Sequence, residues 1–533
     1  MPDPEPPSSP ARAARSTGPS LEVKTLLVSA GMLLSRVAGL ARQTIFSHHF
    51  GLQLEADAFG AALRIPNFLQ NLFGDGVLSA SLIPVYSRLV AQRGRDEADR
   101  VARTVLGLLA IVTSLLVLAG VTFTPVFVDL VAMGFTGYKR ELTITLVRIM
   151  FPGVGLLVGS AWCLAILNTH GKFFNSYAAP AVWNAAIIVA LIWHRHDPLA
   201  HLAVKAAWGA VVGSALQVLT QLPQVIQVMS SGWLRTRLRR TLEVREVIAS
   251  SIPVILSRGA IQVSAFIDGF IASWLGNGPL AALTNAQQLY TFPVSLFGMA
   301  ISSAALPAMS AVGHHDDTRA IAKHLIDGQR LLIVLMVPSV VGFLAFGDVM
   351  ASLLYEGGRF THADSQFVWA VLAGSSVGLI ATTVGRYYAS AFYALGDTKT
   401  PARFAFVRIG LVLALGVLMA RGIPYLFHLD LKWGTPGLTL SAGIAGWVEF
   451  SLLRSALKKR IAEFAVPVNF LVQCWLVAIL AAALTTGLRW ALPDRVYWAR
   501  DLAILVAFGS VYLAGAAAIG VLSVKEVRRR LRF

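Results

Sequence analysis

Long apolar segments recur along almost the whole chain, and they constrain the fold more than any other feature. From about residue 25 to residue 522, apolar runs alternate with short polar or basic loops. A helix crosses a bilayer with about 20 apolar residues, and 56% of the 533 residues are apolar while only 14% are charged. A soluble fold could not bury this much apolar surface, and an outer-membrane barrel would show short alternating segments instead. We therefore predict an all-α, polytopic membrane protein.

The apolar runs predict about fourteen transmembrane helices, preceded by a disordered tail over residues 1–23 that lacks a cleavable signal peptide. The predicted spans are 25–50, 57–90, 103–132, 142–168, 177–194, 202–229, 246–275, 279–312, 328–347, 365–394, 402–421, 433–454, 468–490 and 500–522. The second span is interrupted at residues 65–67 and 74–76, and the eighth at Pro293. Such breaks are tolerated where a helix lines a cavity or is buried in protein.

The distribution of charge predicts the orientation in the membrane. Lys and Arg are concentrated in alternate loops, for example at 88–103, 235–245 and 458–460, and in the tail at 525–532. Cytoplasmic loops carry such an excess, so we expect both termini in the cytoplasm. The net charge of +17 fits these signals together with contact to anionic membrane lipids. No loop is long enough for a nucleic-acid-binding domain, so we expect no nucleic-acid partner.

The sequence contains no motif for a nucleotide or a metal. A phosphate loop of the form Gly-x4-Gly-Lys-Ser/Thr and a His-Glu-x-x-His helix are both absent. The two cysteines, Cys163 and Cys474, lie far apart within apolar runs, which indicates core packing rather than a metal site. We expect no cofactor, no metal and no enzymatic activity.

Two segments of the chain share a pattern that indicates an internal repeat. Residues 68–84 and 290–307 both contain an aromatic residue, then Leu-Phe-Gly, then small residues and a proline. They lie six predicted helices apart. Transporters built from repeated helix bundles show weak internal similarity of this kind.

Charged residues inside the apolar spans are the candidate functional residues, because an unpaired charge at membrane depth costs several kcal/mol. They are Arg36 and Arg42 in the first span, Asp57 at the start of the second, Arg64 beside Pro66, and Arg258 and Asp268 in the seventh. Guanidinium groups match the geometry of phosphate and stay charged, so the arginines favour an anion site. The structural alternatives are snorkelling to the membrane interface and pairing with Asp57.

Several motifs resemble those of one known family. They are residues 35–42 (SRVAGLAR), 55–59 (EADAF), 64–67 (RIPN), 167–169 (LNT), 358–361 (GRFT) and 392–401 (FYALGDTKTP). Together they resemble the MurJ (MviN) lipid II flippases of the multidrug/oligosaccharidyl-lipid/polysaccharide exporter superfamily. The resemblance runs from about residue 24 to the end of the chain.

This resemblance implies a domain organisation and a function. It implies an N-terminal six-helix lobe (24–229), a basic linker (230–245), a C-terminal six-helix lobe (246–460), two helices forming a groove for the lipid tail (461–523) and a basic tail (524–533). The lobes would enclose a cationic cavity that contains Arg36, Arg42 and Asp57. The implied substrate is a lipid-linked peptidoglycan precursor with a diphosphate head and a prenyl tail. It would move from the cytoplasmic to the outer leaflet of the bacterial inner membrane.

The chain departs from the family pattern at several charged positions. Amides stand where the family carries charges, at Gln43, Gln70, Asn71, Gln287 and Gln288. We hypothesise that Arg258 restores positive charge near Gln288, with Asp268 as its partner; the alternative places Arg258 at the cytoplasmic interface. The predicted substrate-binding residues are therefore Arg36, Arg42, Asp57, Arg64 and Arg258, with Asp268, Gln288 and Asn67 as secondary candidates.

The predicted mechanism is alternating access, driven by the membrane potential or by a coupling ion. Cell-wall synthesis enzymes are candidate partners. Four other functions stay open from the residues alone: an exporter of another lipid-linked glycan, an ion-coupled multidrug antiporter, a transferase acting on polyprenyl phosphate, and a non-transporting lipid-binding partner of cell-wall enzymes.

Overall fold

The computed structural model describes residues 21–229, 241–299, 301–302, 305–306, 309, 318–461, 464–491 and 497–521; within α9 the side chains of residues 256–265 are not described. Over these ranges the chain is helical and contains no strand, apart from an isolated bridge between Gly357 and Phe360. The predicted all-α class is confirmed.

The helices fall into two sequential groups with a pair at the C-terminal end. The first group is α1 (Leu21–Phe50), α2 (Leu54–Phe73), α3 (Asp75–Arg93), α4 (Arg95–Thr122), α5 (Thr124–Val131), α6 (Gly137–Thr169), α7 (Phe173–Trp193) and α8 (Leu199–Val228). The second is α9 (Leu242–Ala272), η1 (Ser273–Leu275), α10 (Pro279–Pro293), η2 (Val294–Met299), α12 (Thr318–Tyr355), α13 (His362–Ser376), α14 (Leu379–Ala394), α15 (Lys399–Phe427), η3 (Leu431–Trp433) and α16 (Gly434–Lys458). The terminal pair is α17 (Val468–Ala491) and α18 (Tyr497–Ala518).

Within the described residues, each predicted span coincides with one helix or with a broken helix; several residues between 300 and 312 of the eighth span lie outside them. By length and hydropathy alone, eight of the described helices could cross a membrane, or nine if the bent pair α13 and α14 is counted as one span. The protein is therefore a multi-pass membrane protein, while the number fourteen stays a prediction.

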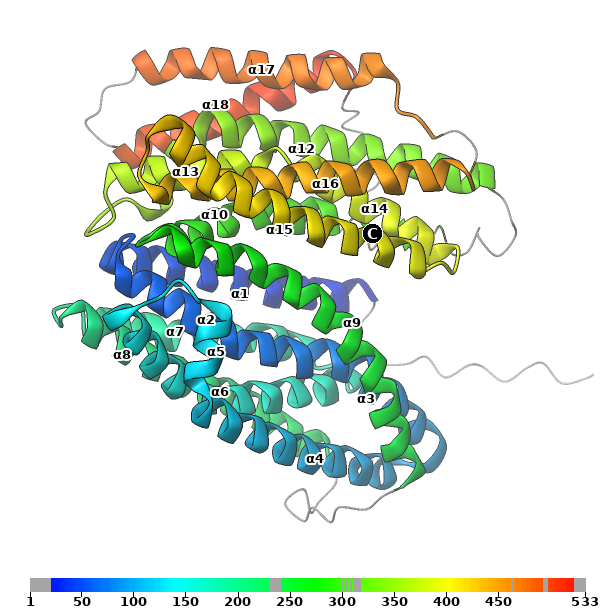
Figure 1. The fold of residues 1–533 in the computed structure, drawn as a ribbon. Helices are drawn as coiled ribbons and strands as arrows, with labels where there is room; N and C mark the ends of the chain where they lie inside the picture. Colours follow the sequence, from blue (N-terminus) through cyan, green and yellow to red (C-terminus); the bar gives the residue numbers. More distant parts are fainter. Residues whose placement is uncertain are drawn as a thin grey trace, which may run out of the picture.

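The two groups of helices pack as separate bundles, and α9 runs between them (Figure 1). The Leu242 end of α9 lies against α3, where Glu246 and Glu243 pair with Arg88 and Arg93 at 2.5 and 2.7 Å. The other end of α9 packs near α10 and α15. The first helix of the predicted C-terminal lobe thus contacts both bundles.

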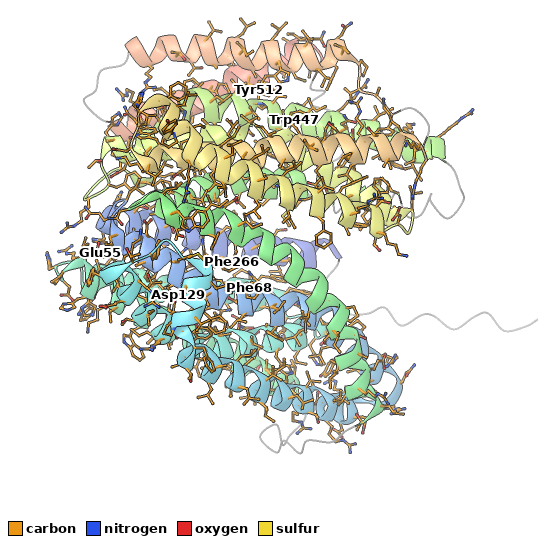
Figure 2. All side chains as sticks on the ribbon, viewed as in Figure 1. Glu55, Phe68, Asp129, Phe266, Trp447 and Tyr512 are labelled. Carbon is orange, nitrogen blue, oxygen red and sulfur yellow. The ribbon has the colours of Figure 1, made fainter. Side chains whose placement is uncertain are left out.

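The terminal helices α17 and α18 pack on the second bundle through α12 (Figure 1). The hydroxyl of Tyr512, labelled on α18 in Figure 2, donates a hydrogen bond of 2.6 Å to the carbonyl of Val334 in α12. An apolar cluster that includes Phe346 and Phe508 fills the contact. The pair is therefore attached to the second bundle.

Helix breaks occur at the same Leu-Phe-Gly motif in both repeat segments. In the first segment α2 ends at Phe73 and α3 begins at Asp75, since the backbone at Gly74 is not helical (φ −87°, ψ −140°). A side chain at residue 74 would collide with the carbonyl of Gln70, so the break requires glycine. In the second, α10 ends at Pro293 and a wider π-helical turn, η2, contains the motif. The predicted breaks near Gly74 and Pro293 are confirmed. The break predicted at residues 65–67 is wrong, since α2 continues through Pro66.

Candidate functional site

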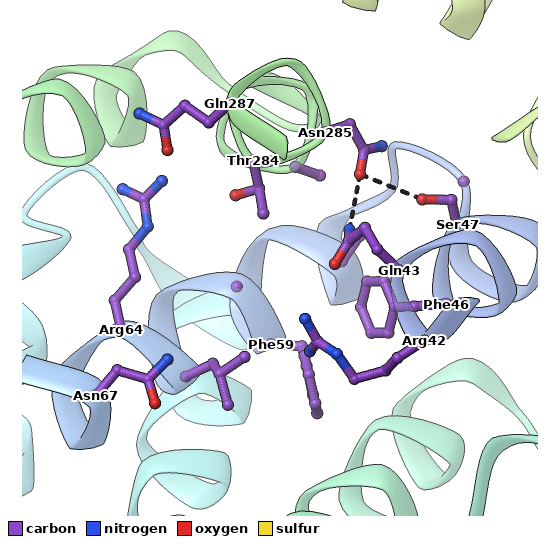
Figure 3. A pocket seen from close by; sticks show the side chains of 15 residues that line it. Arg42, Gln43, Phe46, Ser47, Phe59, Arg64, Asn67, Thr284, Asn285 and Gln287 are labelled. Carbon is purple, nitrogen blue, oxygen red and sulfur yellow. Dashed lines mark hydrogen bonds between the residues drawn. The ribbon is translucent and has the colours of Figure 1, made fainter. Parts of the chain in front are cut away.

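A polar pocket lies between the two bundles, where α1 and α2 face α10 (Figure 3). Its volume is about 190 Å³. The polar side chains in its wall are Arg42, Gln43, Ser47, Arg64, Asn67, Thr284, Asn285 and Gln287. The structure thus brings three predicted site residues together in one wall: Arg42, Arg64 and Asn67.

Arg42 presents its guanidinium group to this pocket from α1. Its Cζ lies 5.5 Å from the ring centroid of Trp183 in α7, which is a cation–π contact. Trp183 is itself held by a hydrogen bond of 3.0 Å from its indole nitrogen to the carbonyl of Ala210. The Nε of Arg42 is buried and has no hydrogen-bond partner among the described residues. This orphaned donor suits an anionic ligand, because a buried polar group without a partner is costly.

Arg64 enters the pocket wall from α2, on the side of Gln287 (Figure 3). Its guanidinium group rests against α9 at Gly269, whose missing side chain leaves room for it. Asp268 and Asp57 attract this charge through space. Arg64 therefore reaches from the first bundle to the second.

A second cavity, of about 340 Å³, adjoins the first through the shared side chains of Thr284 and Gln287. Arg36 and Gln288, both predicted site residues, line it. The guanidinium group of Arg36 donates a hydrogen bond of 2.5 Å to the hydroxyl of Ser295.

Asp268 lies in a third cavity, of about 120 Å³, which also borders Gln287. Its Oδ1 is buried without a hydrogen-bond partner among the described residues. Arg408 shares this cavity and pairs with Glu449 at 3.1 Å. Arg258 belongs to α9, but its side chain lies outside the described residues, so its role stays a prediction.

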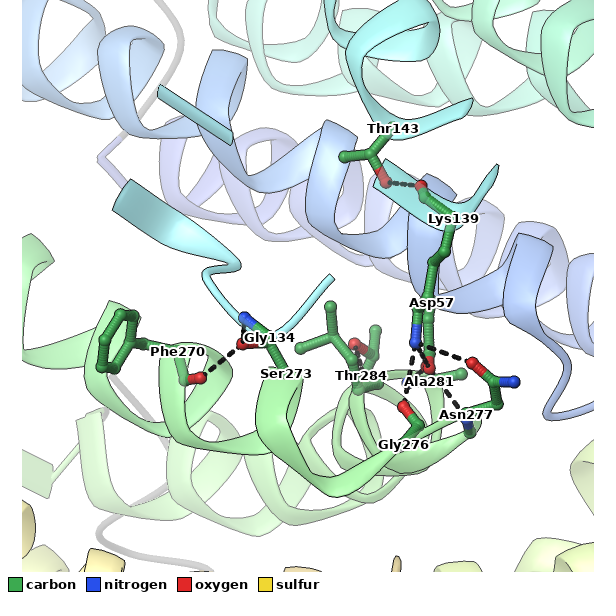
Figure 4. Close-up of polar contacts among 12 residues, drawn as sticks. Asp57, Gly134, Lys139, Thr143, Phe270, Ser273, Gly276, Asn277, Ala281 and Thr284 are labelled. Atoms are coloured by element: carbon green, nitrogen blue, oxygen red, sulfur yellow. Dashed lines mark hydrogen bonds and ion pairs between the residues drawn. The ribbon is translucent and has the colours of Figure 1, made fainter. Parts of the chain in front are cut away.

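Asp57 lies apart from the pocket, in a buried contact between the bundles (Figure 4). Its carboxylate forms an ion pair of 2.7 Å with Lys139 of α6. It also accepts hydrogen bonds of 2.8 Å from each of the backbone amides of Gly278 and Ala281, at the start of α10. Four orphan amides begin every helix, and the helix dipole favours an anion there. We call this contact the latch, defined by Asp57, Lys139 and residues 276–281.

Lys139 completes the latch from the first bundle. Its ammonium group donates hydrogen bonds to the carbonyl of Gly276 at 2.9 Å and to the side-chain oxygen of Asn277 at 3.2 Å. The geometry gives Asp57 a role in joining the bundles, and its direct contact with a substrate stays a prediction. Lys139 was missed by the sequence analysis, because a single lysine in the loop before an apolar span carries no signal of a partner.

Side chains of α1 are buried at the latch end and more exposed toward its other end, where Arg36 still contacts Ser295 of the second bundle. Phe46 and Phe50 are 6% and 0% exposed, whereas Leu33 and Val37 are 63% and 56% exposed. Near the latch, Asn285 of α10 accepts hydrogen bonds from Gln43 at 2.7 Å and Ser47 at 3.3 Å. The same change occurs along α10 and η2, from a buried start to an exposed Leu296 at 65%. The site is therefore closed at the latch end.

The lining chemistry suits a ligand that is anionic in one part and neutral in another. Arg42 and Arg64 offer forked donors for phosphate oxygens. Gln43, Asn67 and Gln287 offer amides that can donate to and accept from neutral polar groups. The arrangement can bind such a ligand between the two bundles.

Comparison with known proteins identifies the family. The family model described as lipid II flippase MurJ matches residues 46–505. The lipid II flippase MurJ of Burkholderia cenocepacia is 31% identical over 506 residues, covering 91% of this chain and 95% of that protein. The probable lipid II flippase MurJ of Vibrio cholerae is 30% identical, covering 93% and 94%.

Solved structures agree on the fold. A lipid II flippase MurJ in an inward closed conformation matches with a TM-score of 0.76 at 22% identity, covering 93% of this chain and 98% of that one. An inward-facing transporter of the MATE family, in the MOP superfamily, matches with a TM-score of 0.66 at 17% identity, covering 82% and 99%. Since the family model spans most of the chain and full-length relatives reach 31% identity, this protein belongs to the MurJ family of lipid II flippases, which are membrane transporters rather than enzymes.

Proposed function

We propose that this chain flips lipid II from the cytoplasmic to the outer leaflet of the bacterial inner membrane. The observation that carries the proposal is a pocket between two bundles that holds two arginines and is closed at one end by the latch. The relatives are named as lipid II flippases. A diphosphate head with a glycan and a peptide offers both the charge and the neutral polar groups that this pocket suits.

The proposed cycle follows alternating access. With both termini in the cytoplasm, as the Lys and Arg distribution predicts, the latch lies at the outer face and the exposed half of α1 at the inner face. The head group would enter from the cytoplasm and bind Arg42 and Arg64. Opening to the outside then requires Asp57 and Lys139 to leave α10, so the latch sets the stability of the inward-facing state.

The prenyl tail would stay in the hydrocarbon while the head crosses. We assign the tail to the surface near α17 and α18, in keeping with the groove that the family resemblance implies. The lipid side of α17 is apolar and open, with Leu476, Leu480 and Leu484 at 53%, 59% and 67% exposed. This division lets the protein shield only the polar head.

The energy source in this proposal is the membrane potential, with a coupling ion as the alternative. Each negative charge that moves outward gains about 2.3 kcal/mol per 100 mV. An ionophore that collapses the potential should therefore stop flipping in cells within the time of the assay. Flipping that continues unchanged would exclude the potential as the driver. We also propose direct contact with cell-wall synthesis enzymes.

Genetic replacement tests the proposed function. The gene should sustain growth of a bacterium depleted of its own lipid II flippase. Arg42→Ala should fail to do so, while Arg140→Ala, which removes a half-buried arginine paired with the exposed Asp129, should succeed. If the wild-type protein is inserted in the membrane but never supports growth, the substrate is a different lipid-linked glycan or another molecule.

A further inference from the structure

Gly269 of α9 occupies the position against which the Arg64 guanidinium rests. A β-carbon built at residue 269 would overlap Nη1 of Arg64 and lie 3.1 Å from its Cζ. Its next neighbour, Cδ1 of Leu280, would be at 3.5 Å, an ordinary van der Waals distance. The position of Arg64 therefore depends on the absence of one side chain in the opposite bundle.

The surrounding contact between α2 and α9 has a defined register. Phe68, one turn after Arg64, meets Phe266 edge to face with ring centroids 5.3 Å apart and planes at 90° (Figure 2). Phe266 lies nearly one turn before Gly269 on α9. Since the two helices run in opposite directions, the aromatic pair places Arg64 opposite Gly269. Aromatic pairs of this geometry are favourable beyond their buried area.

Charge around this position also favours the arginine. Asp268, the residue before Gly269, attracts Arg64, and so does Asp57 more weakly. Asp268 keeps a buried Oδ1 without a hydrogen-bond partner among the described residues. The Arg64 cation at Gly269 thus has a carboxylate from each bundle near it, and it lines the same pocket as Arg42.

We propose that Gly269 forms a seat for Arg64, meaning the space on α9 that the guanidinium group occupies. This seat positions Arg64 as the second diphosphate-binding cation of the pocket, beside Arg42. The identity of the ligand class, a prenyl diphosphate, rests on the proposed function. Gly269 is in these terms a positioning residue: it touches Arg64 rather than the substrate. Because Arg64 belongs to the first bundle and its seat to the second, separation of α2 from α9 withdraws the cation and weakens the hold on the diphosphate.

Binding of undecaprenyl diphosphate to the purified full-length protein in detergent tests the seat. Gly269→Ala should raise the dissociation constant about tenfold or more, because the β-carbon displaces the flexible tip of Arg64. Arg64→Gln should have a similar effect. The double variant should bind no more weakly than either single variant, since both changes remove the same contact. Gly159→Ala is the matched control, because a β-carbon at that helical glycine meets nothing within 4 Å.

Three results would overturn this proposal: wild-type affinity for the probe in Gly269→Ala, an equal loss of affinity in Gly159→Ala, or losses of affinity that multiply in the double variant. The thermal midpoint of Gly269→Ala should not fall, because alanine favours a helix. If Gly269→Ala does not fold, adding Arg64→Ala must restore its folding. Failure of this second change to restore folding would also overturn the proposal. A wild-type protein whose affinity for the probe depends on Gly269 but that does not flip lipid II would contradict the proposed function and leave the proposal about Gly269 intact.

Discussion

Arg42 combines three properties that a substrate-binding cation needs. It lies in the pocket wall, it is oriented by the ring of Trp183, and its Nε has no protein partner among the described residues. The charge pattern of the first span predicted Arg42 as a functional residue, because a charged side chain at membrane depth is energetically costly and is therefore usually functional. Its orientation by Trp183 could not be predicted, since 141 positions separate the two residues in the chain.

Removal of Arg42 should impair binding rather than folding. Hydrogen bonds to charged groups contribute about 1.5–3 kcal/mol, so Arg42→Ala should slow flipping by about 10- to 100-fold and fail to support growth. Membrane insertion and the thermal midpoint should stay close to those of the wild type. Arg140→Ala serves as the control. Normal flipping by Arg42→Ala would assign Arg42 to a structural role.

Arg258 provides a second test of the role of a single residue in transport. If Arg258 replaces the positive charge that is missing at Gln288, Arg258→Gln should abolish transport, and adding Gln288→Arg should restore it. The structure places Gln288 in the cavity that holds Arg36, so an arginine at 288 would enter the polar region. Normal transport by Arg258→Gln would end the compensation hypothesis.

Among the helices, α10 connects the latch to the pocket. Its first residues bind Asp57, its middle supplies Thr284, Asn285 and Gln287 to the pocket, and η2 at its end receives Arg36. The breaks that shape this element were predictable from Pro293 and from the Leu-Phe-Gly motif. The latch was not, because the capping of α10 by Asp57 joins residues more than 200 positions apart.

Loss of the latch should loosen the start of α10. Removing one partner of a buried ion pair costs about 3–5 kcal/mol, so Asp57→Ala should speed hydrogen exchange at the amides of Gly278 and Ala281 at least tenfold. Lys139→Met should act in the same direction. Asp129→Ala, which breaks an exposed pair, should leave α10 unchanged. Unaltered exchange in Asp57→Ala would show that the carboxylate does not cap α10.

The loop before α15 provides a pH-dependent prediction. Asp397 accepts hydrogen bonds from the hydroxyl and amide of Thr400 at 2.7 and 3.0 Å and from the amide of Lys399 at 3.0 Å, and it pairs with Arg460 at 2.8 Å. These contacts, those with Thr400 above all, lower the pKa of Asp397 below the ordinary value of 3.8. A lowered folded-state pKa stabilises the protein above the unfolded-state pKa, and this contribution is lost as pH falls through the folded value.

Thermal melts across pH test this loop. The wild type should melt above Asp397→Asn at pH 5–7, and the difference should shrink as pH falls below about 4 and disappear only below the lowered pKa of the folded carboxylate. Thr400→Val removes the largest contribution and should move this loss to higher pH. A difference between wild type and Asp397→Asn that does not change with pH would show that the charge of Asp397 is not the cause.

At the scale of the whole molecule, sequence patterns predicted the fold class and the family. The structure was needed to show how the two bundles close the pocket at one end. Hydropathy and loop charge are local properties, so they predict the helices and their orientation in the membrane but do not predict how the helices pack. The closure depends on pairs between the bundles, such as Gln43 with Asn285 and Arg64 with Gly269. An amide or a glycine in the sequence gives no indication of its partner in the other bundle. Among the amides at charged family positions, Gln43 and Gln287 line the pocket and Gln288 lines the second cavity.

Lipid II exposure at the outer leaflet tests the central claim most directly. In a bacterium depleted of its own flippase and expressing this chain, an enzyme that cleaves lipid II from outside the inner membrane should consume the accumulated lipid II. Cells expressing Arg42→Ala to the same level should keep their lipid II protected. Protection of lipid II in cells that contain the folded, membrane-inserted wild-type protein would contradict the account.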